Sequence, residues 1–228
     1  MPKDKNIDKT LLMVLSGLLL FGLVMIASAG VAYSRSRFGD PYYFFKHQLL
    51  YGVIPGFAAL YVVQKIDYEF WKKISFPLFV ASIICLIMVF IPGIGNKIYG
   101  ASRWIQLGPF SFQPSEMQKL SLIVYLAAWL ENRRESIKDF YEGLLPFAAI
   151  LSVISFLLMK QPDMGTLGVV ILISMSIYFI SGARLSHIAA MGALGFAALL
   201  LLIKFESYRM DRLLVFLHPE LDPKGIGY

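Results

Sequence analysis

Long apolar stretches separated by short polar segments make up most of this chain. Their lengths predict membrane-spanning helices over about residues 11–33, 45–63, 75–91, 115–130, 144–159, 166–181 and 185–203. About 20 apolar residues in a helix are enough to cross the hydrocarbon core of a bilayer. Because only helices and closed barrels satisfy their backbone groups in lipid, the pattern predicts an all-α polytopic membrane protein with about seven transmembrane helices. We expect residues 1–228 to form a single transmembrane domain.

The composition agrees with this class and excludes others. A content of 57% hydrophobic and 16% charged residues excludes an ordinary soluble domain. The net charge of +6 comes mostly from the segments between the apolar stretches. In a membrane protein such charge indicates lipid headgroups and topology as its partners, and not nucleic acid. Cys85 is the single cysteine, which excludes a disulfide framework, and His47, His187 and His218 are scattered. The residues of this chain therefore support no metal site, and we expect no cofactor, while a requirement for a divalent cation stays open.

The distribution of Lys and Arg favours an N-terminus on the cytoplasmic side. With that orientation ten of these residues lie inside and ten outside, but the inner segments are shorter and so carry a higher density. The first apolar stretch is too long for a cleaved signal peptide and is interpreted as a signal anchor. Residues 92–114 and 204–228 then form two long extracytoplasmic loops. An anionic ligand on the outer face would explain the cations found there.

The segment between the third and fourth predicted helices has an unusual composition. Residues 100–116 read Gly-Ala-Ser-Arg-Trp-Ile-Gln-Leu-Gly-Pro-Phe-Ser-Phe-Gln-Pro-Ser-Glu. Connectors are usually short, whereas this one is long and amphipathic, which suits a position in the headgroup layer. There Arg103 can meet phosphate and Trp104 can anchor at the boundary. Simple interfacial anchoring is the alternative to a binding role for both residues.

The fourth predicted helix begins with ionisable residues. Pro114 suits the first helical position, and Glu116 falls in the first turn, where the helix dipole favours a carboxylate. Lys119 shares a face with Glu116 and Ser115. An ionisable residue inside a spanning helix usually faces the bundle interior and is either functional or paired. A structural Glu116–Lys119 pair and a binding role for both therefore stay open.

A second polar interruption, Gln-Pro-Asp-Met-Gly-Thr at residues 161–166, separates the fifth and sixth predicted helices. In one interpretation Asp163 or Thr166 caps the sixth helix and the proline shapes the turn. In the other, Gln161 and Asp163 line a polar cavity between helices. The two interpretations are compatible.

The third polar region follows the last apolar stretch. Residues 208–212 read Tyr-Arg-Met-Asp-Arg, and residues 218–228 read His-Pro-Glu-Leu-Asp-Pro-Lys-Gly-Ile-Gly-Tyr. Asp222 before proline and two glycines is typical of a turn. It also places a carboxylate on the same predicted face as Arg103. Glycosyl transfer to a sugar hydroxyl needs such a base, together with cations near a pyrophosphate leaving group.

These motifs resemble those of the SEDS family of bacterial membrane glycosyltransferases (FtsW, RodA and SpoVE). The resemblance rests on residues 102–105, 108–116 with Lys119, 161–166, and 208–212 with 222–228, and so spans nearly the whole chain. Residues 42–48 and 182–184 are more similar to the division-type branch than to the RodA branch.

The resemblance implies a function and a set of roles. It implies polymerisation of lipid II into β-1,4-linked glycan at the outer face of the bacterial cytoplasmic membrane. The expected partners are the growing undecaprenyl-linked glycan, a class B penicillin-binding protein and other membrane proteins of the division machinery. Asp222 is the implied catalytic base. The implied substrate-binding residues are Arg103, Trp104, Glu116, Lys119, Gln161, Asp163, Arg209 and Arg212.

Family members have more spanning helices than the seven predicted here, and their motif around the loop aspartate continues into further helices. We therefore expect this chain to be part of a longer protein, with the remaining helices completing the cavity. A lipid II transporter is one alternative function, although it leaves Asp222 without a role. A non-catalytic scaffold for the penicillin-binding partner is another, and an elongation role in place of division is the third.

Overall fold

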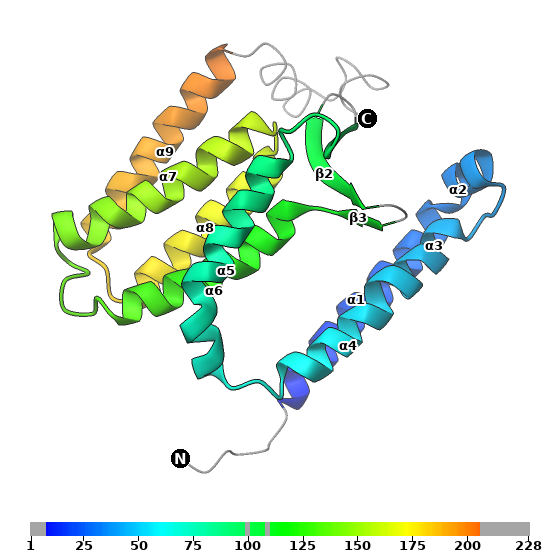
Figure 1. The fold of residues 1–228 in the computed structure, drawn as a ribbon, viewed down its shortest axis with the longest axis horizontal. Coiled ribbons are helices and arrows are strands. Elements are labelled where there is room, and N and C mark those ends of the chain that lie inside the picture. The colour runs from blue at the N-terminus through cyan, green and yellow to red at the C-terminus, as the bar shows by residue number, and fades with distance from the viewer. Residues whose placement is uncertain (1–7, 99–100, 108–109, 206–228) are drawn as a thin grey trace. The chain divides into compact units, whose positions relative to one another are not determined.

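The computed structural model describes residues 8–98, 101–107 and 110–205. The chain forms two compact units, Met1–Tyr68 and Glu69–Tyr228, and each is described here by itself. Figure 1 gives the order of the helices and strands along the chain. Among the described residues, three helical stretches are long and apolar enough to cross a membrane: Lys9–Ala29, Tyr68–Met88 and Phe140–Lys160. Shorter apolar helices cover Met164–Ile180 and Leu185–Leu201. These helices confirm the predicted fold class.

The first unit consists of two helical paths. α1 (Lys9–Ala29) is capped by Asp8, whose Oδ1 accepts from the backbone N–H of Leu11 at 3.0 Å. Gly30 separates α1 from α2 (Val31–Phe38). The returning path combines α3 (Tyr43–Gln48), a π-helical turn η1 (Leu49–Val53) and α4 (Ile54–Val63), and its backbone stays helical at the junctions. Pro55 lies in the first turn of α4, so the π-helical turn precedes the proline.

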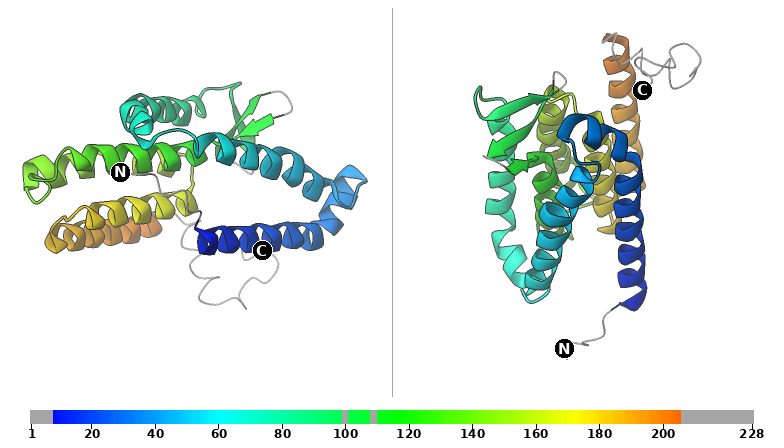
Figure 2. Two further views of the ribbon diagram at one scale, coloured as in Figure 1. Left: turned by 90° about the horizontal axis from the view of Figure 1, so that it is seen from below. Right: turned by 90° about the vertical axis from the view of Figure 1, so that its right-hand side faces the viewer.

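The second unit is a helical bundle with a small sheet at one end. Its helices are α5 (Tyr68–Met88), α6 (Pro114–Glu131), α7 (Leu145–Lys160, preceded by the π-helical turn η2, Phe140–Leu144), α8 (Met164–Ile180) and α9 (Leu185–Phe205). α8 packs against α6, α7 and α9. The two views of Figure 2 show the sheet at the end of the bundle where α7 ends and α8 begins.

The core of the second unit comes from one face of each helix. On α7 the buried residues recur at helical spacing, and they are Phe147, Leu151, Ile154 and Leu158. On α6 the positions one turn apart are Leu122, Leu126 and Leu130, each about 1% exposed. α5 alternates apolar and hydroxyl groups along its buried face, with Ser75, Phe79, Ser82 and Leu86. Such small hydroxyl residues let helices approach closely in a membrane.

The three-stranded sheet was not predicted from the sequence. β1 (Gly95–Ile98), β2 (Ala101–Leu107) and β3 (Phe110–Phe112) pair antiparallel in the order β1-β2-β3. They lie within residues 92–114, which were predicted to form an extracytoplasmic loop, and they overlap the amphipathic segment of residues 100–116. Gly95 brings the chain from α5 into the sheet, where a Cβ would overlap the carbonyl oxygen of Val89. Only glycine fits so close to another backbone segment.

Candidate functional site

Arg103 is the additional residue of a β-bulge. The pairing of β1 with β2 joins Asn96 to Trp104 and then Lys97 to Ser102, so Arg103 has no partner residue on β1. A bulge changes the direction of the side chain and commonly occurs next to functional sites. The neighbouring Ile105 is buried, with 5% of its surface exposed, which fixes the strand against the unit.

The side chain of Arg103 binds the corner between α7 and α8. Its Nε donates to the carbonyl oxygen of Gln161 at 3.2 Å, and its Nη2 donates to that of Pro162. These carbonyls follow the last residue of α7, where a helix leaves its acceptors without intrahelical donors. A cation is also favourable at this end of a helix. The structure therefore brings Arg103 and the 161–163 corner together.

Gln161 and Asp163 are both buried at this corner. The Gln161 side chain is 1% exposed, and its Nε2 donates to the carbonyl oxygen of Leu86 at 3.0 Å. Asp163 is 6% exposed and caps α8, because its Oδ1 accepts from the backbone N–H of Thr166 at 3.3 Å. This confirms the capping interpretation. The second oxygen, Oδ2, is buried and has no hydrogen-bond partner among the described residues.

Lys119 and Glu116 form an ion pair on α6. Lys119 Nζ lies 2.7 Å from Glu116 Oε1, and the two side chains are 24% and 58% exposed. The structural pair considered from the sequence is therefore present. Because β3 ends at Phe112 and α6 begins at Pro114, this pair lies at the same end of the second unit as Arg103.

A buried hydrogen-bond network on α5 and α6 was not predicted. The Ser121 hydroxyl donates to Ser82 Oγ at 2.6 Å, and the Ser82 hydroxyl donates to Gln118 Oε1 at 2.7 Å. Ser115 Oγ and Gln118 Nε2 are buried without partners among the described residues. Ser115, Gln118 and Ser121 recur every three residues, and that polar spacing was the signal in the sequence that could have revealed a common buried face.

Four of the predicted site residues need separate mention. Trp104 is half-buried in β2, opposite Asn96. Asp222, Arg209 and Arg212 lie outside the described residues. Their roles in the site, and their position near Arg103 and Lys119, therefore stay predictions. In the described part of the chain, no group of three or more His, Cys, Asp or Glu residues could hold a metal ion.

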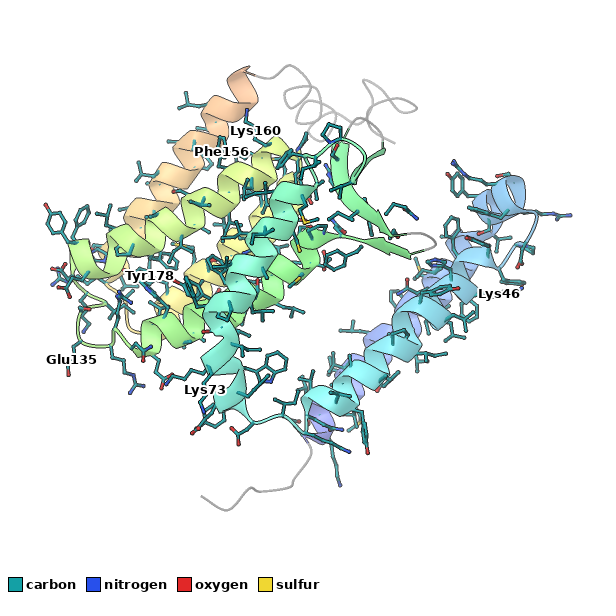
Figure 3. All side chains as sticks on the ribbon, viewed as in Figure 1. Lys46, Lys73, Glu135, Phe156, Lys160 and Tyr178 are labelled. Carbon is teal, nitrogen blue, oxygen red and sulfur yellow. The ribbon has the colours of Figure 1, made fainter. Side chains whose placement is uncertain are left out.

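The opposite end of the second unit carries structural interactions. Figure 3 shows Glu135 and Tyr178 toward that end and Lys160 at the sheet end. Tyr178 is fully buried, stacks on Phe147 with ring centroids 4.2 Å apart, and donates from its hydroxyl to the carbonyl oxygen of Ile137 at 3.2 Å. These contacts hold the 132–139 connector against α7 and α8.

Asp139 begins the helical stretch that leads into α7. Its Oδ1 accepts from the backbone N–H groups of Glu142 at 2.9 Å and Tyr141 at 2.7 Å. These two bonds hold the pKa of the Asp139 carboxyl below its ordinary value of 3.8. The charged form of Asp139 is therefore part of the folded structure.

Comparison with known proteins identifies relatives over the whole length of the chain. The family model described as "Cell cycle protein", which represents FtsW, RodA and SpoVE, matches residues 8–228. The chain is 38% identical over 221 residues to a "Probable peptidoglycan glycosyltransferase FtsW" of Trichlorobacter lovleyi, covering 97% of this chain and 58% of the relative. It is 35% identical over 226 residues to "Stage V sporulation protein E" of Bacillus subtilis, covering 99% of this chain and 62% of the relative.

Solved structures show the same relationship. One comes from work on polymerization and crosslinking by a peptidoglycan synthase complex, with a TM-score of 0.66 and 30% identity over 91% of this chain and 61% of that chain. Another is the rod shape determining protein RodA of Thermus thermophilus, with a TM-score of 0.60 and 29% identity over 81% of this chain and 58% of that chain. The chain thus spans about 60% of the length of these relatives. By this match, the chain belongs to the FtsW, RodA and SpoVE family of cell cycle proteins.

Proposed function

We propose that this protein is a peptidoglycan glycosyltransferase that polymerises lipid II into β-1,4-linked glycan during septal wall synthesis. The observation that carries the proposal is the match of almost the whole chain to curated relatives named as peptidoglycan glycosyltransferases of the FtsW type. Those names also favour a division role over an elongation role. The cluster of polar and ionisable side chains at one end of a helical membrane bundle also supports the proposal, because such groups are rare in membrane segments and usually mark functional sites.

In the proposed reaction Asp222 is the general base. It takes the proton from the 4-hydroxyl of the acceptor GlcNAc, and that oxygen attacks the anomeric carbon of the donor MurNAc. The bond from that carbon to the pyrophosphate oxygen breaks with inversion, and undecaprenyl pyrophosphate leaves with the electron pair. The chemistry needs no redox step, and we expect no cofactor from this chain.

The remaining site residues have proposed roles in binding. Lys119, Arg209 and Arg212 supply positive charge for the pyrophosphate, which is stabilised as its charge grows in the transition state. Glu116 holds Lys119 through the 2.7 Å ion pair. Gln161 and Asp163 are buried, and their proposed role is to line a polar cavity between the helices. Trp104 anchors the sheet at the membrane boundary.

The proposed setting is the bacterial cytoplasmic membrane, with the N-terminus in the cytoplasm and the sheet outside. The structural neighbour from a peptidoglycan synthase complex supports a second subunit that crosslinks glycan. We propose that this partner is a class B penicillin-binding protein and that other division membrane proteins join it.

The test is polymerisation of purified lipid II by the protein as the cell produces it, reconstituted with its partner. Asp222→Asn should reduce glycan formation by at least about a thousandfold, as expected when a catalytic base is removed. Asp211→Asn, a change of the same kind in the same loop, should retain activity. Polymer from the Asp222 variant at wild-type rate would remove Asp222 from the mechanism. Transbilayer movement of labelled lipid II without polymer would instead identify a transporter.

A further inference from the structure

The interaction between Arg103 and the 161–162 backbone has a consequence for the role of this arginine. A guanidinium binds phosphate most strongly in a bidentate way, through two parallel N–H groups on one edge. In Arg103 the edge formed by Nε and Nη2 is already occupied by the carbonyl oxygens of Gln161 and Pro162. A side chain that is occupied in this way is poorly placed to bind a pyrophosphate bidentately through the same edge.

The same contacts fix the corner that carries Asp163. Arg103 reaches the corner from β2, while the Gln161 side chain ties it to Leu86 of α5 at 3.0 Å. The Asp163 backbone N–H donates to the carbonyl oxygen of Leu158 at 3.1 Å, and its Oδ1 caps α8. These bonds leave one oxygen of Asp163, the buried Oδ2, without a partner among the described residues. Contacts from β2, α5, α7 and α8 therefore hold Asp163 in place while its Oδ2 stays unpaired.

The β-bulge is an independent indication that this geometry is specific. Arg103 is the residue that β2 inserts opposite β1, so its side chain does not follow the regular alternation of the strand. The partner strand β1 begins at Gly95, whose close contact with the Val89 carbonyl ties the sheet to the end of α5. The bulge thus presents a cation from a sheet anchored on α5 to the carbonyls at the end of α7.

We propose that Arg103 is a positioning residue, which acts on the substrate through Asp163 and not by binding pyrophosphate. The inference rests on the proposed function for its effect on catalysis. The structural part of the inference is independent of the proposed function. The 161–163 corner should lose its rigidity without Arg103, whatever reaction the protein performs.

The test combines hydrogen exchange with kinetics on the reconstituted protein. In Arg103→Ala, the backbone amides of residues 161 and 163–167 should exchange at least about tenfold faster than in wild type, because local opening becomes easier. Arg103→Lys should give an intermediate effect, since a lysine can contact one carbonyl but not two. Arg133→Ala, which removes a guanidinium stacked on Trp129 with the carbon 4.7 Å from the ring, is the matched control and should leave these amides unchanged.

The kinetic arm separates positioning from direct binding. For a positioning residue, Arg103→Ala should lower kcat by about tenfold or more while KM for lipid II changes by less than about twofold. Added guanidinium ion should restore part of that kcat in Arg103→Ala and none in Asp222→Asn. Unchanged exchange at residues 161–167 overturns the inference. A raised KM with an unchanged kcat also overturns it, since that result identifies Arg103 as a substrate ligand.

If Arg103→Ala does not fold, the Arg103→Lys variant carries both measurements. If wild type does not polymerise lipid II, the proposed function fails and the exchange measurement still decides whether Arg103 holds the corner.

Discussion

The side chain of Gln161 and the backbone of Leu86 are joined by a hydrogen bond of 3.0 Å between positions 75 residues apart in sequence. Both residues are almost completely buried, at 1% and 0% exposure. The bond connects the end of α7 to the last turn of α5. It also supplies a donor to a carbonyl near the end of α5, where the helix offers few of its own.

Removing the Gln161 amide should destabilise the protein. Gln161→Leu leaves the buried Leu86 carbonyl without this donor, which costs about 1–3 kcal/mol for an unsatisfied buried group. The measurement is thermal unfolding in lipid nanodiscs. Gln64→Leu, on an exposed residue at the end of α4, is the control and should shift the midpoint little. Equal midpoints for Gln161→Leu and wild type would show that the bond contributes nothing to stability.

The buried network on α5 and α6 predicts an asymmetry between two substitutions. Ser82→Ala removes the donor to Gln118 Oε1 and leaves both ends of that amide unpaired, so it should cost about 1–3 kcal/mol. Gln118→Leu instead removes the unpaired Nε2, and the one O–H of Ser82 can then donate to the Phe79 carbonyl oxygen, 2.7 Å away. That variant should lie within about 1 kcal/mol of wild type.

Ser174→Ala is the matched control for Ser82→Ala. Its hydroxyl is also fully buried, but it donates only within α8, to the carbonyl oxygen of Val170 at 2.7 Å. Thermal unfolding of Ser82→Ala, Gln118→Leu and Ser174→Ala in the same lipid measures the three losses of stability. A larger loss for Gln118→Leu than for Ser82→Ala would contradict it.

The Glu116–Lys119 pair should matter for activity far more than for stability. Ion pairs three residues apart on a helix with an exposed partner contribute only about 0.5 kcal/mol, and Glu116 is 58% exposed. Glu116→Gln should therefore unfold almost as wild type does. Under the proposed function, Lys119→Met should reduce polymerisation by about tenfold to a hundredfold, the effect of losing one charge-assisted hydrogen bond.

Thermal unfolding of Glu116→Gln checks the effect on stability, and lipid II polymerisation by Lys119→Met checks the effect on activity. The control is Lys72→Met, which breaks a 2.9 Å pair with Glu131 and should leave both quantities nearly unchanged. Loss of folding in Lys119→Met would instead assign this lysine a structural role.

Asp139 gives a pH dependence with a defined sign. Its folded pKa is lowered below the ordinary 3.8 by the backbone N–H groups of Glu142 and Tyr141. The charged carboxylate therefore stabilises the fold above that ordinary value, and the contribution disappears as the pH falls through the lowered folded pKa. The difference in unfolding temperature between wild type and Asp139→Ala should be constant from pH 7 down to about pH 5 and shrink below about pH 4. A difference that grows on acidification would reverse the assigned sign.

The length of the apolar stretches was enough to predict the long helices, because about 20 consecutive apolar residues cross a bilayer as a helix. The short helix α2 was not predicted. The sequence also predicted that Asp163 caps a helix and that Glu116 can pair with Lys119, since each of these contacts spans only three residues. Local contacts of this kind can be read directly from spacing.

The contacts that define the site could not be predicted in the same way. The hydrogen bond from Arg103 to Gln161 joins residues 58 positions apart in the sequence, and the one from Ser82 to Gln118 joins residues 36 positions apart. No local pattern specifies such pairs, because they depend on how the helices pack. The sheet did leave a signal: Gly-Pro at residues 108–109 separates two short segments with aromatic and β-branched residues, which is typical of a turn between strands.

Gly95 limits how this sheet can vary. The atom that any other residue would add there meets the Val89 carbonyl, which belongs to the main chain and cannot rotate away. Every substitution of Gly95 should therefore destabilise the fold, whatever the size or polarity of the new side chain. Replacing Gly95 by an uncharged residue thus disturbs the junction between α5 and β1 without adding or removing an ionisable group.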